Sequence, residues 1–327
     1  MAEPEPQSQP ESSQATQGPT DRQTLVFMTI LSVVCALILA ILASALAKPK
    51  EEAKELDRSR QMLIAAGLLD YQGRFLMQDD KGKTVPAKYY KEGVVVAGTK
   101  EDFATRDQML AVYRRRLVPF LLEGKNKLKT FEEAGVDFDD YVTSHKKQGY
   151  YTLPDKLLYK IVPNPSKEEA ERPANPKEAP AIGWVIPVNG FGLWDAIYGY
   201  LALEPDANTV RGITWYDQKE TPGLGAIISE ADWQLLFPGK KVFQPSRDGK
   251  TDFKSAPLGI TVIKGKVNEM LGDQPKAHSS VDGMAGATLT GNGVTAAYKE
   301  VLGAYRPFLY QVHQEWASQE SSPPTGS

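Results

Sequence analysis

The most regular pattern of apolar and polar positions lies near the C-terminal end of the chain. Apolar residues recur there at i, i+3, i+4, i+7, i+8 and i+11, the spacing of a helix with one buried face. They are Val294, Ala297, Tyr298, Val301, Leu302 and Tyr305. This spacing predicts a helix near 293–314, and Thr290 or Asn292 stands where an N-cap residue is preferred.

Shorter apolar runs predict strands near 181–188, 197–203, 210–216 and 258–266. A second helix is predicted near 226–237. Upstream, residues 51–69 predict a helix that Gly67 bends or ends, and residues 70–162 mix turns with helical stretches such as 109–122. This order of strands and helices predicts an α+β fold.

The longest apolar segment covers residues 24–47 and contains no charged side chain. A helix of this length, at about 1.5 Å per residue, exceeds the roughly 30 Å of hydrocarbon in a bilayer. We therefore predict a single transmembrane anchor. The alternative is a secretory signal peptide, since Ala45-Leu46-Ala47 before Lys48 resembles a cleavage site. The apolar segment is nevertheless longer than the usual signal core of about 7–15 residues.

Polar segments mark the boundaries of the predicted folded part. Residues 1–23 are rich in Gln, Pro, Ser and Glu, which predicts a disordered tail, and residues 316–327 predict a flexible end. Residues 163–180 are rich in Pro, Lys and Glu, which is typical of a surface loop. The globular region then consists of residues 48–162 and 181–315.

Composition narrows the possible functions. With 327 residues, a formal net charge of -3 and a pI near 5.8, the chain lacks the basic surface of a nucleic-acid-binding protein. Its one cysteine, Cys35, lies in the apolar segment, so this chain alone forms neither a disulfide framework nor an iron–sulfur cluster. His145, His278 and His313 lack metal-ligand spacing, and we predict no metal site. No Gly-x-Gly-x-x-Gly follows a strand, so we expect no NADH site.

A segment at 282–290, Asp-Gly-Met-Ala-Gly-Ala-Thr-Leu-Thr, places the hydroxyl of Thr288 on a glycine-framed turn ahead of the predicted helix. The free N–H groups and partial positive charge at a helix start stabilise an anion, so a phosphate on Thr288 is favoured there. The segment is not a P-loop, which requires Gly-Lys-Ser/Thr. The alternative is an ordinary turn followed by an ordinary helix cap.

A second segment, Glu-Thr-Pro-Gly-Leu-Gly at 220–225, follows the predicted strand over 210–216. Proline and two glycines predict a tight loop with exposed backbone. Such a loop can line a ligand that needs close backbone approach, hydrogen bonds to its polar edge and an apolar contact on its face. Gly223 and Gly225 allow the close backbone approach. Glu220 and Thr221 supply the hydrogen bonds, and Leu224 supplies the apolar contact. The alternative is a plain connection between a strand and a helix.

A third segment, Gly-Phe-Gly-Leu-Trp at 190–194, follows the predicted strand over 181–188. Leu193 and Trp194 offer large apolar surfaces for contact with an aromatic ring. The alternative places both side chains in the core, where large apolar residues after a strand usually lie.

These segments resemble the FMN-binding domain family. Its flavinylation motif is Asp-x-x-Ser/Thr-Gly-Ala-Thr with Thr or Ser two residues on, and the Thr after Gly-Ala forms a phosphoester with FMN. Thr288 matches that position, and the family usually has Ser or Thr where this chain has Ala285. The resemblance implies FMN binding at the other matching positions, Asp282, Gly286, Ala287 and Thr290. The Glu-Thr-Pro-Gly-Leu-Gly loop, which lines the flavin in this family, matches completely.

The third segment is similar to the Gly-Tyr-Gly-Leu-Trp of one branch, the C-type subunit of the sodium-translocating NADH:quinone oxidoreductase, and the likeness runs from about residue 181 to 313. It implies a subunit whose covalent FMN relays electrons toward a second flavoprotein subunit. The whole complex would be an NADH:ubiquinone reductase coupled to sodium export, and a flavin transferase would attach the cofactor. The alternatives are the equivalent subunit of an Rnf-type electron transport complex, and a non-redox membrane-tethered binding or scaffold protein.

The predicted orientation in the membrane rests on two conflicting signals. Arg22 precedes the apolar segment, whereas five basic residues follow it: Lys48, Lys50, Lys54, Arg58 and Arg60. The positive-inside rule alone therefore places the globular region in the cytoplasm. The resemblance implies the opposite, a bacterial inner-membrane protein with a cytoplasmic N-terminus and a periplasmic globular domain, and we follow the resemblance because long domains translocate despite flanking charge.

Overall fold

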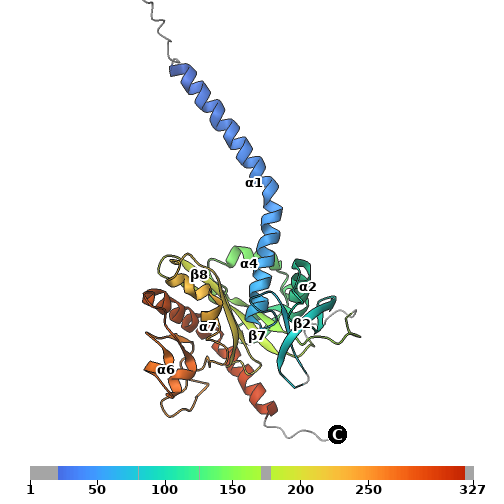
Figure 1. Ribbon diagram of the computed structural model, residues 1–327, viewed down its shortest axis with the longest axis vertical. Helices are drawn as coiled ribbons and strands as arrows, with labels where there is room; N and C mark the ends of the chain where they lie inside the picture. Colours follow the sequence, from blue (N-terminus) through green and yellow to red (C-terminus); the bar gives the residue numbers. More distant parts are fainter. Residues whose placement is uncertain (1–20, 80, 125, 171–177, 321–327) are drawn as a thin grey trace, which may run out of the picture. The chain divides into compact units, whose positions relative to one another are not determined.

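The structure is a computed structural model that describes residues 21–320 apart from 80, 125 and 171–177 (Figure 1). The chain divides into two units, Met1–Lys54 and Glu55–Ser327. Residues 1–20 and 321–327 of the predicted tails lie outside the described residues, whereas residues 21–23 and 316–320 are helical, so the predicted boundaries of both tails are wrong.

The first element is one long helix, α1 (Asp21–Ala65). Its segment Asp21–Leu46 is long and apolar enough to cross a membrane, which fits the predicted single span. The separate helix predicted over 51–69 is instead the continuation of α1, which ends earlier. Gly67 ends the helix with a left-handed φ of +65°, and the N–H of Leu68 returns to the Leu63 carbonyl oxygen at 2.9 Å.

An antiparallel sheet of six strands lies in the second unit, in the order β5-β4-β6-β7-β8-β9. The strands are β4 (Leu117–Glu123), β5 (Lys127–Lys129), β6 (Asp155–Ile161), β7 (Gly183–Phe191), β8 (Ala196–Leu203) and β9 (Val210–Asp217). The last three confirm the strands predicted over 181–188, 197–203 and 210–216.

The other half of the sheet comes from a region predicted to consist of helices and turns. Helix α2 (Arg106–Arg116) ends inside the predicted helical stretch 109–122, and β4 follows at once. Pro119 disfavours a continued helix because it removes a backbone donor. Strand β4 pairs with β6 along its whole length. The helical prediction beyond Arg116 is therefore wrong, since tertiary pairing overrides local periodicity.

Residues 66–152 also contain a second antiparallel sheet, of three strands in the order β1-β2-β3. The remaining elements of this region are β1 (Phe75–Gln78), β2 (Thr84–Lys91), β3 (Val94–Ala97), α3 (Phe131–Ala134), α4 (Phe138–His145) and the 3-10 helix η1 (Tyr150–Thr152). The side chains of Thr105, Thr130 and Asp137 cap the starts of α2, α3 and α4, as these residue types commonly do.

The segment between β9 and the last helix is less regular than the pattern predicted. Its elements are the 3-10 helix η2 (Gly225–Ser229), α5 (Ala231–Gln234), β10 (Thr261–Val262), α6 (Val267–Met270), the 3-10 helix η3 (Pro275–Ser279) and β11 (Ser280–Val281), which pairs in parallel with β10. The helix predicted over 226–237 is thus two short turns, and the strand over 258–266 is much shorter. Gly259 and Gly265, with left-handed φ, bend the chain at both ends of that strand.

The last helix, α7 (Thr288–Glu320), carries the predicted apolar stripe, and all of the stripe residues are buried. It begins at Thr288 rather than near 293. The N-cap role predicted for Thr290 or Asn292 is therefore wrong, because both residues lie inside the helix. The hydroxyl of Thr290 donates to a carboxylate oxygen of Glu220 instead.

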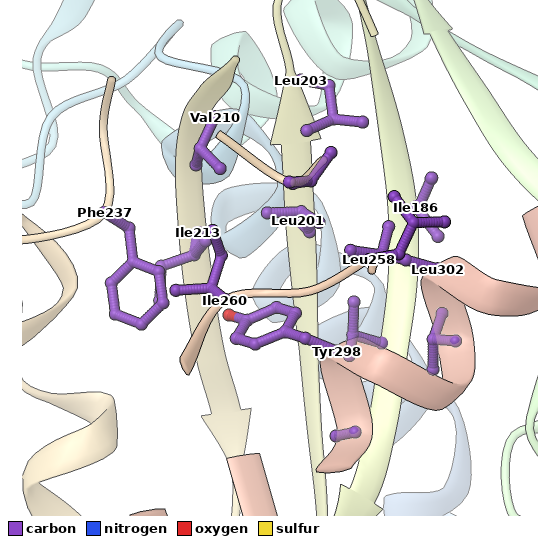
Figure 2. Close-up of a cluster of buried hydrophobic side chains, with 14 of the residues drawn as sticks. Ile186, Leu201, Leu203, Val210, Ile213, Phe237, Leu258, Ile260, Tyr298 and Leu302 are labelled. Carbon is purple, nitrogen blue, oxygen red and sulfur yellow. The ribbon is translucent and has the colours of Figure 1, made fainter. Parts of the chain in front are cut away.

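Apolar cores cover both faces of the six-stranded sheet. Strand β8 shows the alternation, since Leu201 and Leu203 lie in one core and Tyr200 lies in the other. Figure 2 shows Tyr298 and Leu302 of α7 beside the strand side chains of the first core. The second core includes the last turns of α1 and part of α2. This arrangement confirms the predicted α+β fold.

Candidate functional site

Three segments singled out in the sequence come together where β7, β9 and α7 meet. Residues 190–194 end β7 and begin the turn to β8, and residues 220–225 follow β9. Residues 282–290 connect β11 to the first turn of α7. The Phe191 carbonyl oxygen lies directly against Gly293 of α7. Segments far apart in the sequence therefore form one surface.

Glu220 connects the three segments. Its side chain is buried, with 5% of the residue exposed. The backbone N–H of Leu193 donates to both carboxylate oxygens at 3.0 Å, and the N–H of Trp194 donates to Oε1 at 3.0 Å. The Thr290 hydroxyl donates to Oε2. Burial raises the pKa of the Glu220 carboxyl, but these hydrogen bonds outweigh burial and bring the pKa below its ordinary value, so the carboxylate is ionised at neutral pH.

Two further contacts join the loop at 220–225 to the other two segments. The indole N–H of Trp194 donates to the Thr221 hydroxyl oxygen at 3.1 Å. Gly286 has a left-handed φ of +74°, and a Cβ at this position would lie 2.9 Å from Cδ2 of Leu224. Gly286 is thus suited both to the turn and to contact with the second segment.

Thr288 is the first residue of α7, and it is exposed. The N–H of Gly291 donates to the Ala287 carbonyl oxygen at 3.0 Å, which begins the helical hydrogen bonding. The N–H groups of residues 288–290 precede this bond, so they belong to the part of a helix that lacks partners within the helix. Residue 285, an alanine, is exposed on the same turn.

Five large apolar side chains on these three segments are not buried. The exposed fractions are 74% for Phe191, 48% for Leu193, 68% for Trp194, 41% for Leu224 and 59% for Leu289. Together these five residues are the apolar surface of the site. The alternative that Leu193 and Trp194 are core residues is wrong. Phe191 and Leu289 were not predicted as site residues from the sequence. Leu289 carried a signal, because it falls outside the apolar stripe of α7 and lies next to Thr288.

The other predicted site residues have structural partners. Asp282 accepts the N–H of Val267 on Oδ1 at 2.8 Å, and its carbonyl oxygen accepts the indole N–H of Trp233 at 3.1 Å. Gly225 is buried against Thr290 and Glu220, so it packs two segments together rather than exposing backbone. Gly223 is exposed, and its φ of +72° forms the turn.

The candidate metal ligands are dispersed. His145 lies in α4, His278 in η3 and His313 in α7. Within the part of the chain that the structure describes, no group of three or more His, Cys, Asp or Glu side chains is placed to hold a metal ion. The site instead combines an exposed hydroxyl, a helix start and an apolar surface. This combination suits an organic ligand that carries both a phosphate and a flat ring.

Comparison with known proteins agrees with this chemistry. Residues 192–303 match the FMN-binding domain family. The chain is 39% identical to the C-type subunit of the Na(+)-translocating NADH-quinone reductase of Chlamydia caviae, over 87% of this chain and 90% of that protein. It is 30% identical to the corresponding subunit of Pasteurella multocida, over 88% of this chain and 92% of that protein.

The crystal structure of Shewanella oneidensis NqrC is 25% identical, covers 64% of this chain and 90% of that one, and superposes with a TM-score of 0.47. The identity to the curated relatives extends over nearly the full length of both proteins. The chain therefore belongs to the family of C-type subunits of the Na+-translocating NADH-quinone reductase, an oxidoreductase complex, and contains its FMN-binding domain.

Proposed function

We propose that this chain is the electron-relay subunit of a membrane NADH:ubiquinone reductase, with FMN attached covalently to Thr288, and that the complex couples quinone reduction to sodium ion export. One observation supports this most directly. The exposed hydroxyl at the start of α7 stands beside the apolar surface, and Glu220 joins the segments that carry both.

The start of α7 supports attachment at Thr288. A phosphoester on its hydroxyl places a negatively charged group at the positive end of the helix dipole, beside the N–H groups of residues 288–290. Because Thr288 is exposed, a flavin transferase can reach the hydroxyl. Thr288 can also carry the cofactor without any movement of the buried apolar residues of α7.

The apolar surface supports placement of the flavin ring. Leu224 stands next to Gly286 of the attachment segment, and Leu193 and Trp194 are fixed through their N–H groups. Bound FMN supplies one- and two-electron redox chemistry, while these residues place the ring and limit its contact with water. The exposure of the surface also allows close approach by an electron partner, which we propose to be a second flavoprotein subunit.

The relay role predicts a specific loss in membranes. Inner membranes from cells without this chain should lose NADH-driven ubiquinone reduction and sodium uptake, while NADH oxidation by an artificial acceptor should continue, since this chain is not expected to bind NADH. Quinone reduction and sodium uptake should return when the chain is supplied on a plasmid. Normal NADH-driven quinone reduction in membranes that lack only this chain would contradict the proposal.

Leu224→Ala tests the ring contact. The shorter side chain should admit water to the ring and favour its more charged, reduced form, which raises the midpoint potential. Stabilisation of a two-electron reduced form by about 1.4 kcal/mol corresponds to a rise of about 30 mV. The absorption band should also shift while covalent attachment stays complete. Leu235 is another exposed leucine. Leu235→Ala is therefore the control, and it should change neither the absorption spectrum nor the midpoint potential. An unchanged spectrum and potential in Leu224→Ala would place Leu224 outside the ring contact.

A further inference from the structure

Glu220 has an unusual environment for a carboxylate in a loop. A charged group is costly to bury unless hydrogen bonds replace its water, and removal of its partners leaves a large penalty. The donors here come from distant parts of the chain, namely the N–H groups of Leu193 and Trp194 and the hydroxyl of Thr290. Both carboxylate oxygens are thus occupied by protein donors. A residue with this set of partners is poorly placed to bind a ligand directly.

The partners of Glu220 flank the two halves of the proposed FMN site. Leu193 and Trp194 belong to the apolar surface, and Thr290 follows Thr288 in the first turn of α7. The carboxylate therefore fixes the position of the attachment residue relative to the surface on which the ring is proposed to rest. Among the described residues, the other contacts between the segment 190–194 and α7 are packing contacts, such as that of the Phe191 carbonyl oxygen with Gly293.

The segments close tightly around this carboxylate. A Cβ at Gly192 would overlap Oε1 of Glu220, and a Cβ at Gly225 would lie 2.5 Å from Oγ1 of Thr290. Glycine at both positions lets the backbone of two segments approach the carboxylate. The exposed Asp195–Lys219 ion pair, with 2.5 Å between Oδ2 and Nζ, joins the residues next to the same two segments.

We propose that Glu220 is a positioning residue for the FMN site rather than a ligand of the flavin ring. Its buried carboxylate fastens residues 190–194 and the first turn of α7 to the loop at 220–225. The cofactor then meets an ordered surface when it is attached. This inference rests on the proposed function for the identity of the cofactor, but the fastening of the segments is a property of the chain alone.

Hydrogen exchange in the full-length chain without flavin, in detergent, tests the fastening directly. In Glu220→Gln, the acceptor loses its negative charge, which weakens the charge-assisted hydrogen bonds from the N–H groups of Leu193 and Trp194. These N–H groups should therefore exchange at least tenfold faster, which corresponds to about 1.4 kcal/mol. Exchange in β6 and in the second half of α7 should be unchanged. Glu230→Gln is the matched control, because Glu230 is exposed and its side chain makes no cap hydrogen bond. Unchanged exchange at 190–194, or equal acceleration throughout the domain, would overturn the proposal.

The second measurement uses the chain produced with a flavin transferase. Glu220→Gln should acquire covalent flavin about tenfold more slowly than Glu230→Gln, and iodide should quench its attached flavin more strongly. A wild-type chain that acquires no covalent flavin would refute the proposed function, while the exchange data would still decide the role of Glu220. Normal attachment and quenching in Glu220→Gln would refute the positioning role alone.

Thr290→Val gives a milder variant if Glu220→Gln does not fold. Valine keeps the shape of the side chain and removes one donor to Glu220. It should accelerate exchange at Leu193 and Trp194 less than Glu220→Gln does. The double variant should accelerate it no more than Glu220→Gln alone, since residues in one hydrogen-bond network are not additive. Additive effects on exchange would show that Thr290 and Glu220 act separately.

Discussion

Thr288→Ala is expected to abolish covalent FMN on this chain. The substitution removes the proposed nucleophilic hydroxyl, while the exposed position at the start of α7 tolerates alanine without loss of core packing. Protein produced with a flavin transferase should keep yellow fluorescence through denaturing electrophoresis in the wild type and lose it in the variant. The mass of the intact chain should show the same difference.

Conservative variants separate the hydroxyl from the shape of the side chain. Thr288→Ser should retain some covalent flavin because it keeps a hydroxyl, and Thr288→Val should retain none although it keeps the branched shape. Thr221→Val changes another exposed threonine of the same site and should keep the flavin attached. Fluorescent Thr288→Ala protein on a denaturing gel would move the attachment to a different residue.

The parts of the fold that were predictable have strong local patterns. The stripe from Val294 to Tyr305 predicts the face of α7 that packs on the sheet, and the apolar runs predict β7, β8 and β9. The three site segments were found because glycine, proline and threonine at fixed spacings restrict backbone and chemistry locally. Only the family resemblance implied that these segments lie together, because local sequence patterns do not predict contacts between distant segments.

The parts that were not predictable depend on distant contacts. Strands β4 and β6 pair across more than thirty intervening residues, and their local sequence resembles helical or turn-rich segments. The predicted start of α7 lies too late in the sequence because Thr290 and Asn292 both suit an N-cap, whereas the Thr290 hydroxyl donates to Glu220. The burial of Glu220 could likewise not be predicted from the sequence, because an acidic residue in a polar loop is usually exposed.

The orientation of the globular domain is the second prediction with an all-or-none result. The sequence places five basic residues after the span, which would favour a cytoplasmic domain. Two of these basic residues have partners in the structure. Arg58 pairs with Asp139, with 3.4 Å between Nη2 and Oδ1, and Arg60 donates to the Tyr71 carbonyl oxygen at 3.0 Å. Both side chains therefore have partners in the folded unit, and long domains translocate largely regardless of flanking charge.

A reporter fused after Ser327 decides the orientation. Alkaline phosphatase forms its disulfides and becomes active only in the oxidising periplasm, so the fusion should have high activity, whereas a cytoplasmic fluorescent reporter at the same position should be dark. Phosphatase fused before Met1 is the control and should be inactive. The mature chain should also retain residues 1–23, since an uncleaved anchor is expected instead of cleavage after Ala47. A bright cytoplasmic reporter after Ser327 would reverse the topology and place Thr288 on the opposite side from a periplasmic flavin transferase.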